Sequence, residues 1–534
     1  MGGAARLTGE HMNRRGAILL AVAALLAACG GGSGDQGGDA PPPPPPPVVQ
    51  VSVAPADIAI APAAIQQFSC TVTGNANTQC TWRVQEGAAG GTVSAAGLYT
   101  APAAAGIFHV IAASVADPGR TATATVRVTA ANAATPWVTG YYAGWFWDVM
   151  YPPQEVDMTA MTHFVFGRVA PGGGSLGGTP GTLEKGAGTA HDAGLSPDGT
   201  RSVEDYLIQR AHAANTRALL MLGGDGPDGI GFLRSTTDAM RPTFVRTIVD
   251  YLVAHDYDGV DIDWENELEG NAGLGVSAAE ARRRLMALIA DVRTEANSRP
   301  RYSGANRPVI ITFPGYAVSI NFLEPGGRVE QWQADVANMV DQYNLMSYGI
   351  GTAFNGAGWD SWFSGPILGA TGTTPYDLNT SINAYVATGV PRWKLGIGIG
   401  FYGIFYGPTI TGPRQSTATN GIFVTDDVAL RYAELVRKGY LDDRNGTYHW
   451  DDAARVGYRS YGGGGYVPAI DPASPRAGFL SYEDERSIAA KGNWVRETGV
   501  GGTILWTLNY GYLAQSRTNP LLAAVKQSFL PQRR

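Results

Sequence analysis

The sequence predicts a multidomain protein in which a (β/α)8 TIM barrel follows a small all-β sandwich. Three observations carry this prediction. At 534 residues the chain is too long for one ordinary domain. From Pro136 onward apolar runs alternate with amphipathic segments, which is typical of a parallel sheet built from βαβ units. Residues 48–130 instead contain short alternating runs separated by Gly, Asn and Pro turns, at a spacing typical of a sandwich.

The composition excludes some classes of partner. The net charge is −7, the pI is near 5.6, and no basic stripe occurs, which argues against binding of nucleic acid. Only three cysteines are present and none follows Cys80, so we expect the large domain to depend on core packing alone.

The N-terminus has the pattern of an export signal. Arg14-Arg15 precede an apolar run, residues 16–28, that is too short to span a bilayer as a mature helix. Leu26-Ala27-Ala28-Cys29 resembles a bacterial lipobox, in which the cysteine is acylated and becomes the mature N-terminus. An ordinary secretory signal with a chance cysteine is the alternative. We expect a signal peptide over residues 1–28 and a lipid anchor to a bacterial membrane, the outer membrane for preference.

Residues 29–47 read as a linker. They are rich in Gly and Ser and end in seven prolines at 41–47, a polyproline II rod of about 20 Å. Such a rod would hold the following domains away from the membrane.

Residues 48–130 are predicted to form the sandwich. The segment 91–102 resembles bacterial immunoglobulin-like modules. Cys70 and Cys80 could cross-link neighbouring strands in an oxidising compartment. The module could be a spacer or a carbohydrate binder, and the pattern that places Trp82 in the core favours a spacer.

The barrel is predicted over residues 137–530, with its largest insertion at about 405–480, between strands seven and eight. This insertion is predicted to contain a helix from Asp426 to Lys438. Residues 242–255 are predicted to form the helix before strand four, and Ser277 to Glu280 a capping box that opens the helix 281–296. The eight candidate strands are 137–142, 163–169, 218–222, 258–263, 309–313, 342–346, 395–399 and 503–506.

The fourth strand carries the candidate chemistry. In Asp258-Gly-Val-Asp-Ile-Asp-Trp-Glu265, alternation places Asp261, Asp263 and Glu265 on one face and the apolar residues on the other. Acids about 7 Å apart in succession in a poorly solvated interior cannot all ionise, so at least one should hold a proton near neutral pH. A protonated acid beside a carboxylate is suited to cleaving a glycosidic bond.

Two other interpretations of this acidic row compete. A solvated strand face is disfavoured by the apolar flanking residues. A site for a hard cation is disfavoured because no His or second acidic motif stands at a matching strand end. We therefore expect neither a metal nor a cofactor.

DGVDIDWE resembles the DxxDxDxE signature of glycoside hydrolase family 18, the chitinases and their relatives. The resemblance implies that Glu265 protonates the leaving oxygen, while the carbonyl oxygen of the substrate's own 2-acetamido group attacks C1 with retention. Asp263 would hydrogen-bond both Glu265 and the acetamido N–H, and Asp261 would lie deeper and support Asp263. Asp258 would be structural.

Other segments extend the resemblance. Residues 342–349 are similar to the family's MxYD segment, which implies that Tyr348 donates to the acetamido carbonyl and that Asn344 and Met346 line the sugar pocket. Trp506 would form the floor beneath the sugar, with Tyr141 matching it on strand one. The insertion resembles an α+β domain that deepens the cleft in one branch of the family.

Gly223 and Gly224 resemble the end of the family's SxGG segment, where small residues let the backbone pass close to the catalytic strand. Departures from the family's patterns also occur. Met221 replaces Ser and Gly349 replaces the Asp of MxYD, while Asp225, Asn266 and Arg168 stand where aromatic residues are common. Fewer stacking platforms predict a weaker grip on crystalline polymer and a soluble or different aminosugar substrate. Arg168 could face an anionic substituent or pair with an acid.

The function expected from these residues is hydrolysis of β-1,4 N-acetylglucosamine linkages in chitin or chito-oligosaccharides, by a monomer. An endo-β-N-acetylglucosaminidase on other glycans and a chitin-binding lectin with weak activity are the alternatives. The retained acids argue against the lectin.

Overall fold

The computed structural model describes residues 48–60, 65–102, 104, 106–128, 135–186, 190–303, 308–317, 329–353, 359–407, 409–417, 427–462 and 477–531. The predicted signal peptide, Cys29 and the proline-rich linker lie outside the described residues. Among the helices that are described, none is long and apolar enough to cross a membrane.

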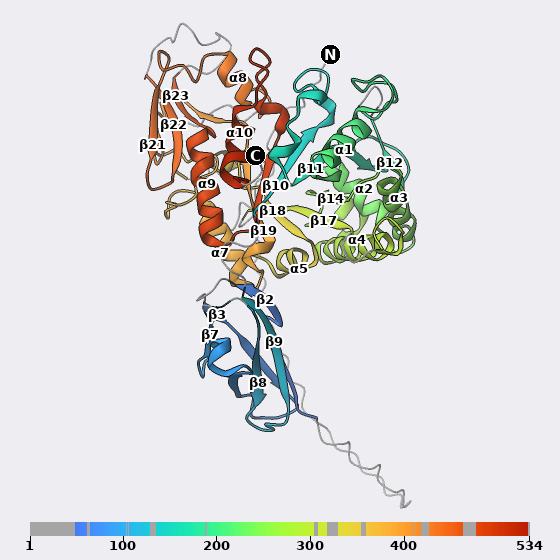
Figure 1. The fold of residues 1–534 in the computed structure, drawn as a ribbon, viewed down its shortest axis with the longest axis vertical. Coiled ribbons are helices and arrows are strands. Elements are labelled where there is room, and N and C mark those ends of the chain that lie inside the picture. Colours follow the sequence, from blue (N-terminus) through green and yellow to red (C-terminus); the bar gives the residue numbers. More distant parts are fainter. Residues whose placement is uncertain are drawn as a thin grey trace, which may run out of the picture. The chain divides into compact units, whose positions relative to one another are not determined.

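Eight parallel strands form a closed barrel, because the first strand pairs with both the second and the eighth (Figure 1). This confirms the predicted eight-stranded parallel barrel, and each strand lies within two residues of its predicted bounds. In order around the barrel they are β10 (Trp137–Ala143), β11 (His163–Pro171), β13 (Arg217–Gly224), β14 (Gly259–Trp264), β17 (Ile310–Gly315), β18 (Gln342–Leu345), β19 (Leu395–Gly400) and β24 (Gly502–Trp506). A short strand, β12 (Leu183–Glu184), pairs antiparallel with β11.

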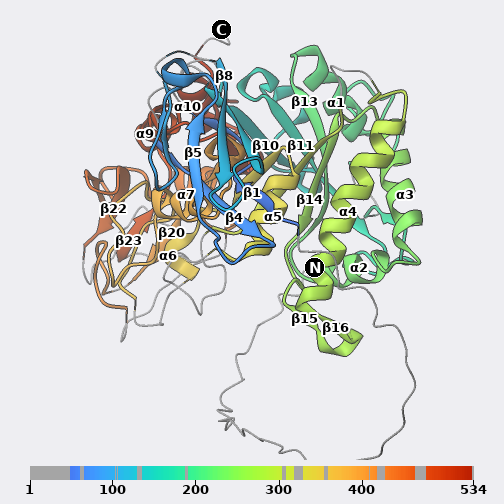
Figure 2. The same cartoon turned by 90° about the horizontal axis from the view of Figure 1, so that it is seen from below.

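Helices cover the outside of the barrel, and α3 and α4 lie side by side there (Figure 2). They are α1 (Val203–Ala213), α2 (Asp228–Ser235), α3 (Arg241–Ala254), α4 (Ala278–Ser298), α5 (Gln331–Met339), α7 (Leu378–Ala387), α9 (Glu485–Thr498) and α10 (Pro520–Phe529). The apolar row of β14 faces this layer: Val260, Ile262 and Trp264 are fully buried, and Trp264 stacks on Phe232 of α2 with ring centroids 4.8 Å apart.

Only half of the predicted capping box forms at the start of α4. The Ser277 hydroxyl accepts a hydrogen bond from the Glu280 amide at 3.3 Å. The Glu280 carboxylate does not return to the Ser277 backbone, because it binds Arg283 and Arg284 at 2.7 Å each. Both arginines lie about one helical turn from Glu280. The carboxylate therefore pairs with their guanidinium groups and does not accept the hydrogen bond from the Ser277 backbone amide that would complete the capping box.

Between β19 and β24 the chain forms a separate antiparallel sheet, with the order β20 (Ile404–Tyr406), β23 (Gly478–Ser481), β22 (Val456–Tyr461) and β21 (Thr447–Asp451). The helix α8 (Tyr432–Arg437) belongs to this segment and begins later than its predicted start at Asp426. Residues 427–430 form a turn instead.

Residues 50–128 form short strands in three small sheets. The sheets are β1 (Gln50–Ala54) with β4 (Ser69–Thr73); β2 (Asp57–Ile60), β9 (Thr121–Val128), β8 (Gly106–Ser114) and β5 (Cys80–Val84); and β3 (Ile65–Gln67), β7 (Leu98–Thr100) and β6 (Thr92–Val93). Phe68, Tyr99 and Val110 are buried in their core, and the partly buried Trp82 packs against it.

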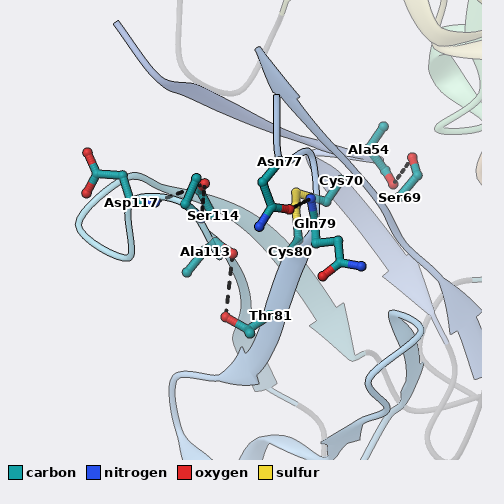
Figure 3. Close-up of a disulfide and its surroundings, with 11 residues drawn as sticks. Ala54, Ser69, Cys70, Asn77, Gln79, Cys80, Thr81, Ala113, Ser114 and Asp117 are labelled. Carbon is teal, nitrogen blue, oxygen red and sulfur yellow. Dashed lines mark hydrogen bonds between the residues drawn. A yellow bond between two sulfur atoms is a disulfide. The ribbon is translucent and has the colours of Figure 1, made fainter. Parts of the chain in front are cut away.

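Cys70 of β4 and Cys80 of β5 form a disulfide whose Cα atoms are 6.4 Å apart (Figure 3). It closes the turn in which the Gln79 amide donates to the Asn77 side chain. The bond therefore links two of the small sheets.

Candidate active site

The acidic row lies where strand alternation predicts it. Asp261 and Asp263 are buried residues of β14, and the partly buried Glu265 follows directly after the strand. Asp258 lies at the other end, where it binds His212 Nε2 at 3.0 Å, Arg217 Nη1 at 3.1 Å and the Ala218 amide at 2.9 Å. This end anchors the strand, and the catalytic candidates occupy the end where barrel enzymes carry their sites.

Asp261 is held from both sides. Its Oδ2 accepts a hydrogen bond from the Tyr141 hydroxyl at 2.8 Å, and its Oδ1 accepts one from the Thr312 hydroxyl. Burial raises the pKa of Asp261 to about 6, although the two hydrogen bonds oppose the rise. The Tyr141 hydroxyl therefore donates its hydrogen bond to Asp261, inside the barrel.

Asp263 lies between the other two acids. Burial raises its pKa well above the usual value, and the charges of Glu265 and Asp261 add to the rise, while Arg168 opposes it. Its Oδ1 is a buried atom that accepts no hydrogen bond from the described residues. Buried acceptors are normally paired, so this atom is suited to receiving a donor from a bound ligand.

Glu265 lies just beyond the C-terminal end of β14 and is the only partly buried acid of the three. Burial raises its pKa to about 7, the charge of Asp225 adds to this rise, and a hydrogen bond with Asp263 opposes it. Its backbone carbonyl accepts a hydrogen bond from the Tyr316 hydroxyl, which fixes the main chain there. Together the acids hold at least one proton at neutral pH, as a general acid requires.

Tyr348, Met346 and Trp506 border one apolar cluster in the barrel interior, which contains Tyr141 and Met221. The charges of Glu265 and Asp263 act on the Tyr348 hydroxyl, which places it near both acids. The Tyr141 and Trp506 rings are 5.8 Å apart. The structure thus brings these predicted residues together with the acids.

Asn344 departs from its predicted place. It is fully buried, accepts a hydrogen bond from Trp137 Nε1 at 3.1 Å and donates one to Gln342 Oε1 at 3.2 Å. Alternation does direct it into the barrel, as predicted, but two residues below Met346 the barrel is filled by side chains. Asn344 therefore joins an interior polar network and has no open face for a sugar.

Gly223 and Gly224 permit the close approach expected of them. Gly223 pairs with Asp263 in the sheet and has φ +97°, and a Cβ there would lie 2.5 Å from the Asp263 carbonyl oxygen. Gly224 has φ +141°. Side chains are excluded at Gly223 because β13 passes directly beside the backbone of Asp263.

The sequence left open whether Arg168 faces an anionic substituent or pairs with an acid, and its partners in the structure decide this. Its guanidinium binds the buried carboxylate of Asp228, donates to the Gly223 carbonyl at 3.2 Å and donates to the Ser175 hydroxyl at 3.0 Å. Arg168 pairs with an acid, and this acid is the first residue of α2.

Gly349 and Asn266, two further departures, have local partners in the structure. Gly349 has φ +64°, a conformation that favours glycine, and its amide donates to the Ser364 hydroxyl at 3.0 Å. The Asn266 side chain accepts a hydrogen bond from the Gly226 amide, and its carbonyl accepts one from Trp264 Nε1 at 2.8 Å. Asn266 thus ties the ends of β13 and β14 together.

Two residues near the site were missed by the sequence reasoning. Asp427 Oδ2 accepts hydrogen bonds from Trp506 Nε1 at 3.3 Å and from the Tyr510 hydroxyl at 3.1 Å. Trp145 is 41% exposed and its ring lies 6.3 Å from that of Trp506. The aromatic run after the first strand could have indicated Trp145, whereas no local signal marks Asp427.

Within the described residues, no group of three or more His, Cys, Asp or Glu side chains is arranged to hold a metal ion. That the site works without a metal or cofactor stays a prediction.

Comparisons with known proteins agree with this arrangement. The family model described as glycosyl hydrolases family 18 matches residues 138–511. Chitinase A1 of Niallia circulans is 26% identical over 289 residues, which are 52% of this chain and 38% of that protein. Chitinase 1 of Aphanocladium album is 24% identical over 380 residues, or 68% of this chain and 79% of that one.

Solved structures show the same fold. A chitinase from Rhizomucor miehei is 19% identical and aligns with a TM-score of 0.53, covering 73% of this chain and 99% of that one. A class V chitinase from Nicotiana tobaccum is 18% identical, with a TM-score of 0.54, over 74% of this chain and 99% of that one. Since the family model spans more than half of the chain and includes the whole acidic row, the protein belongs to glycosyl hydrolases family 18.

Proposed function

We propose that this protein is a chitinase-type glycoside hydrolase that cleaves β-1,4 N-acetylglucosamine linkages in chitin or chito-oligosaccharides. The observation that carries the proposal is Glu265, an acid whose pKa is raised to about 7 at the C-terminal end of β14, beside the buried Asp263. Relatives named chitinases over most of the barrel support the substrate class.

In the proposed reaction, Glu265 transfers its proton to the glycosidic oxygen as the bond between that oxygen and C1 breaks. The carbonyl oxygen of the acetamido group on the same sugar bonds to C1 from the opposite side and gives an oxazolinium ion. Asp263 Oδ1, which lacks a partner in the described chain, accepts the acetamido N–H and steadies the positive charge. Water, deprotonated by Glu265, then attacks C1 from the side that the leaving group vacated, and the bond between C1 and the acetamido oxygen breaks. The N-acetyl group is restored, Glu265 regains its proton, and the configuration at C1 is retained.

Tyr348 and the aromatic floor position the sugar in this scheme. The Tyr348 hydroxyl donates to the acetamido carbonyl and holds it under C1, while the sugar's apolar face stacks on Trp506. Asp427 and Tyr141 act indirectly: Asp427 orients the Trp506 ring through its N–H, and Tyr141 holds Asp261.

The experiment is hydrolysis of aryl-chito-oligosaccharides of graded length, with the anomer of the first product read by NMR. We expect the β-anomer, and no turnover of cellulose-type chains that lack the acetamido group. Glu265→Gln, which is nearly isosteric, should lose about 10²–10⁴ in kcat. An α-anomer as first product, or near-normal hydrolysis by Glu265→Gln, would contradict the proposal.

We also propose that residues 48–130 act as an immunoglobulin-like spacer and that Cys29 is lipid-anchored in a bacterial envelope. The closed disulfide Cys70–Cys80 supports an oxidising compartment. Packing of Trp82 against the sandwich core, rather than exposure as a flat sugar platform, supports a spacer.

A further inference from the structure

Asp225 stands at the end of β13, beside the proposed proton donor. Gly223 pairs with Asp263 and Gly224 with Trp264, so the next residue on each strand brings Asp225 level with Glu265. The charge of Asp225 acts on the carboxyl of Glu265 and also on the hydroxyl of Tyr316, just after β17. The carboxylate therefore lies over the rim where these strand ends meet.

Local bonds hold this carboxylate in place while leaving it exposed to solvent. Asp225 Oδ1 accepts a hydrogen bond from the Gly226 amide at 2.7 Å, and the same amide also binds the Asn266 side chain. Pro227 and the start of α2 follow directly. The position is thus preorganised, and a ligand does not have to order it.

No cation of the described chain neutralises Asp225. Arg168 reaches the neighbouring Gly223 carbonyl, but its charge is paired with the buried Asp228. No Lys, Arg or His among the described residues lies within ion-pair distance of Asp225. Glu265 and Asp263, the nearest ionisable groups at this rim besides Arg168, are acids and cannot supply the missing positive charge.

The position of Asp225 in the barrel indicates whether it lies beside the sugar cleaved at C1 or beside the leaving sugar. The sugar that is cleaved at C1 rests on Trp506 and Tyr348, from β24 and the end of β18, whereas Glu265 reaches the oxygen that leaves. Asp225 adjoins Glu265 from β13, whereas Tyr348 comes from the end of β18, which lies beyond β17 on the other side of β14. Asp225 therefore faces the leaving sugar, where an aromatic platform would favour a neutral apolar face and a carboxylate favours a cation.

We infer that Asp225 selects a glucosamine ammonium in the leaving-sugar position, so that the preferred substrate is partially deacetylated chitin. The inference rests on the proposed function, because the sugar cleaved at C1 must still carry its acetamido group. An exposed charge pair of this kind changes binding by about two- to five-fold. The effect of Asp225 is confined to the leaving-sugar position of the substrate.

The test is digestion of a randomly half-acetylated chitosan at mildly acidic pH, where glucosamine carries its proton. Mass spectrometry of the products identifies the new reducing ends, from the cleaved sugar, and the new non-reducing ends, from the leaving sugar. Wild type should give N-acetylglucosamine at the reducing ends and a two- to five-fold enrichment of glucosamine at the non-reducing ends. High salt should reduce this enrichment.

Asp225→Asn keeps the acceptor for the Gly226 amide and should abolish the enrichment, and Asp225→Lys should reverse it. Glu497→Gln, at an exposed acid on α9, controls for net charge and should leave it unchanged. If wild type and Asp225→Asn gave the same proportion of glucosamine at the non-reducing ends, the inference would be overturned. Reducing ends rich in glucosamine would instead overturn the proposed function, so the two failures are distinguishable.

Discussion

At the scale of single residues, the proton on Glu265 decides where on the pH scale the enzyme works. Its pKa is raised to about 7, first by burial and then by the charge of Asp225. A general acid must be protonated to act, so kcat/KM should fall as pH rises through about 7. The shift thus sets the basic limb of the pH profile.

Removing the negative charge of Asp225 should move the basic limb of the pH profile. A neighbouring carboxylate disfavours ionisation of Glu265, so Asp225→Asn should lower its pKa and shift the basic limb toward lower pH. The measurement is kcat/KM for an aryl-chito-oligosaccharide between pH 4 and 9, with Glu497→Gln as the control of equal charge change. A limb that stays in place, or moves upward, would show that Asp225 does not act on Glu265.

At the scale of elements, the site depends on how closely β13 approaches β14. Trp264 stacks on Phe232 behind the acids, and Gly223 leaves room for both the Phe232 ring and the Asp263 backbone. A Cβ at Gly223 would lie 2.5 Å from each of them. This contact lets β13 pass close to the backbone of Asp263.

Gly223→Ala should therefore destabilise the fold by at least ~2 kcal/mol, from overpacking together with an unfavourable positive φ. Gly226→Ala is the matched control: its φ is +80°, but its Cβ would meet no atom within 4 Å, so it should lose only about 1 kcal/mol. Denaturant unfolding measures both. Equal losses would mean that strain alone, and not the close packing of the strands, makes glycine necessary at Gly223.

At the scale of the whole molecule, the two folded parts are stabilised in different ways. The N-terminal sheets, residues 50–128, contain the disulfide Cys70–Cys80, whereas the chain has no cysteine after Cys80 and the barrel depends on its packed core. The remaining cysteine, Cys29, is the proposed lipid attachment site, and the prolines at 41–47 would separate it from the folded domains.

Growth with a labelled fatty acid should label the protein, and the label should disappear in Cys29→Ala while the enzyme keeps its activity. Extraction into detergent should distinguish the two forms, because only the acylated chain partitions with membrane. A wild-type protein that is released unlabelled into the medium would refute the anchor.

Much of the fold could be predicted because its signals are local. Strand alternation depends only on the period of two residues, so the acidic and apolar faces of β14 are correct, and the eight apolar runs locate the barrel strands. The start of α8 and the second half of the Ser277 capping box could not be predicted in this way. In the latter, nearby arginines compete for the same carboxylate.

The sequence by itself determined the barrel, the order of its strands and the row of acids at one strand end. Only the tertiary structure decided that Arg168 pairs with Asp228, that Asn344 is enclosed in the barrel, that Asp427 supports Trp506 and that Asp225 acts on Glu265. These contacts join residues 40 to 207 positions apart. Periodicity describes which way a side chain points along its own element, but the partner it meets depends on how distant elements pack.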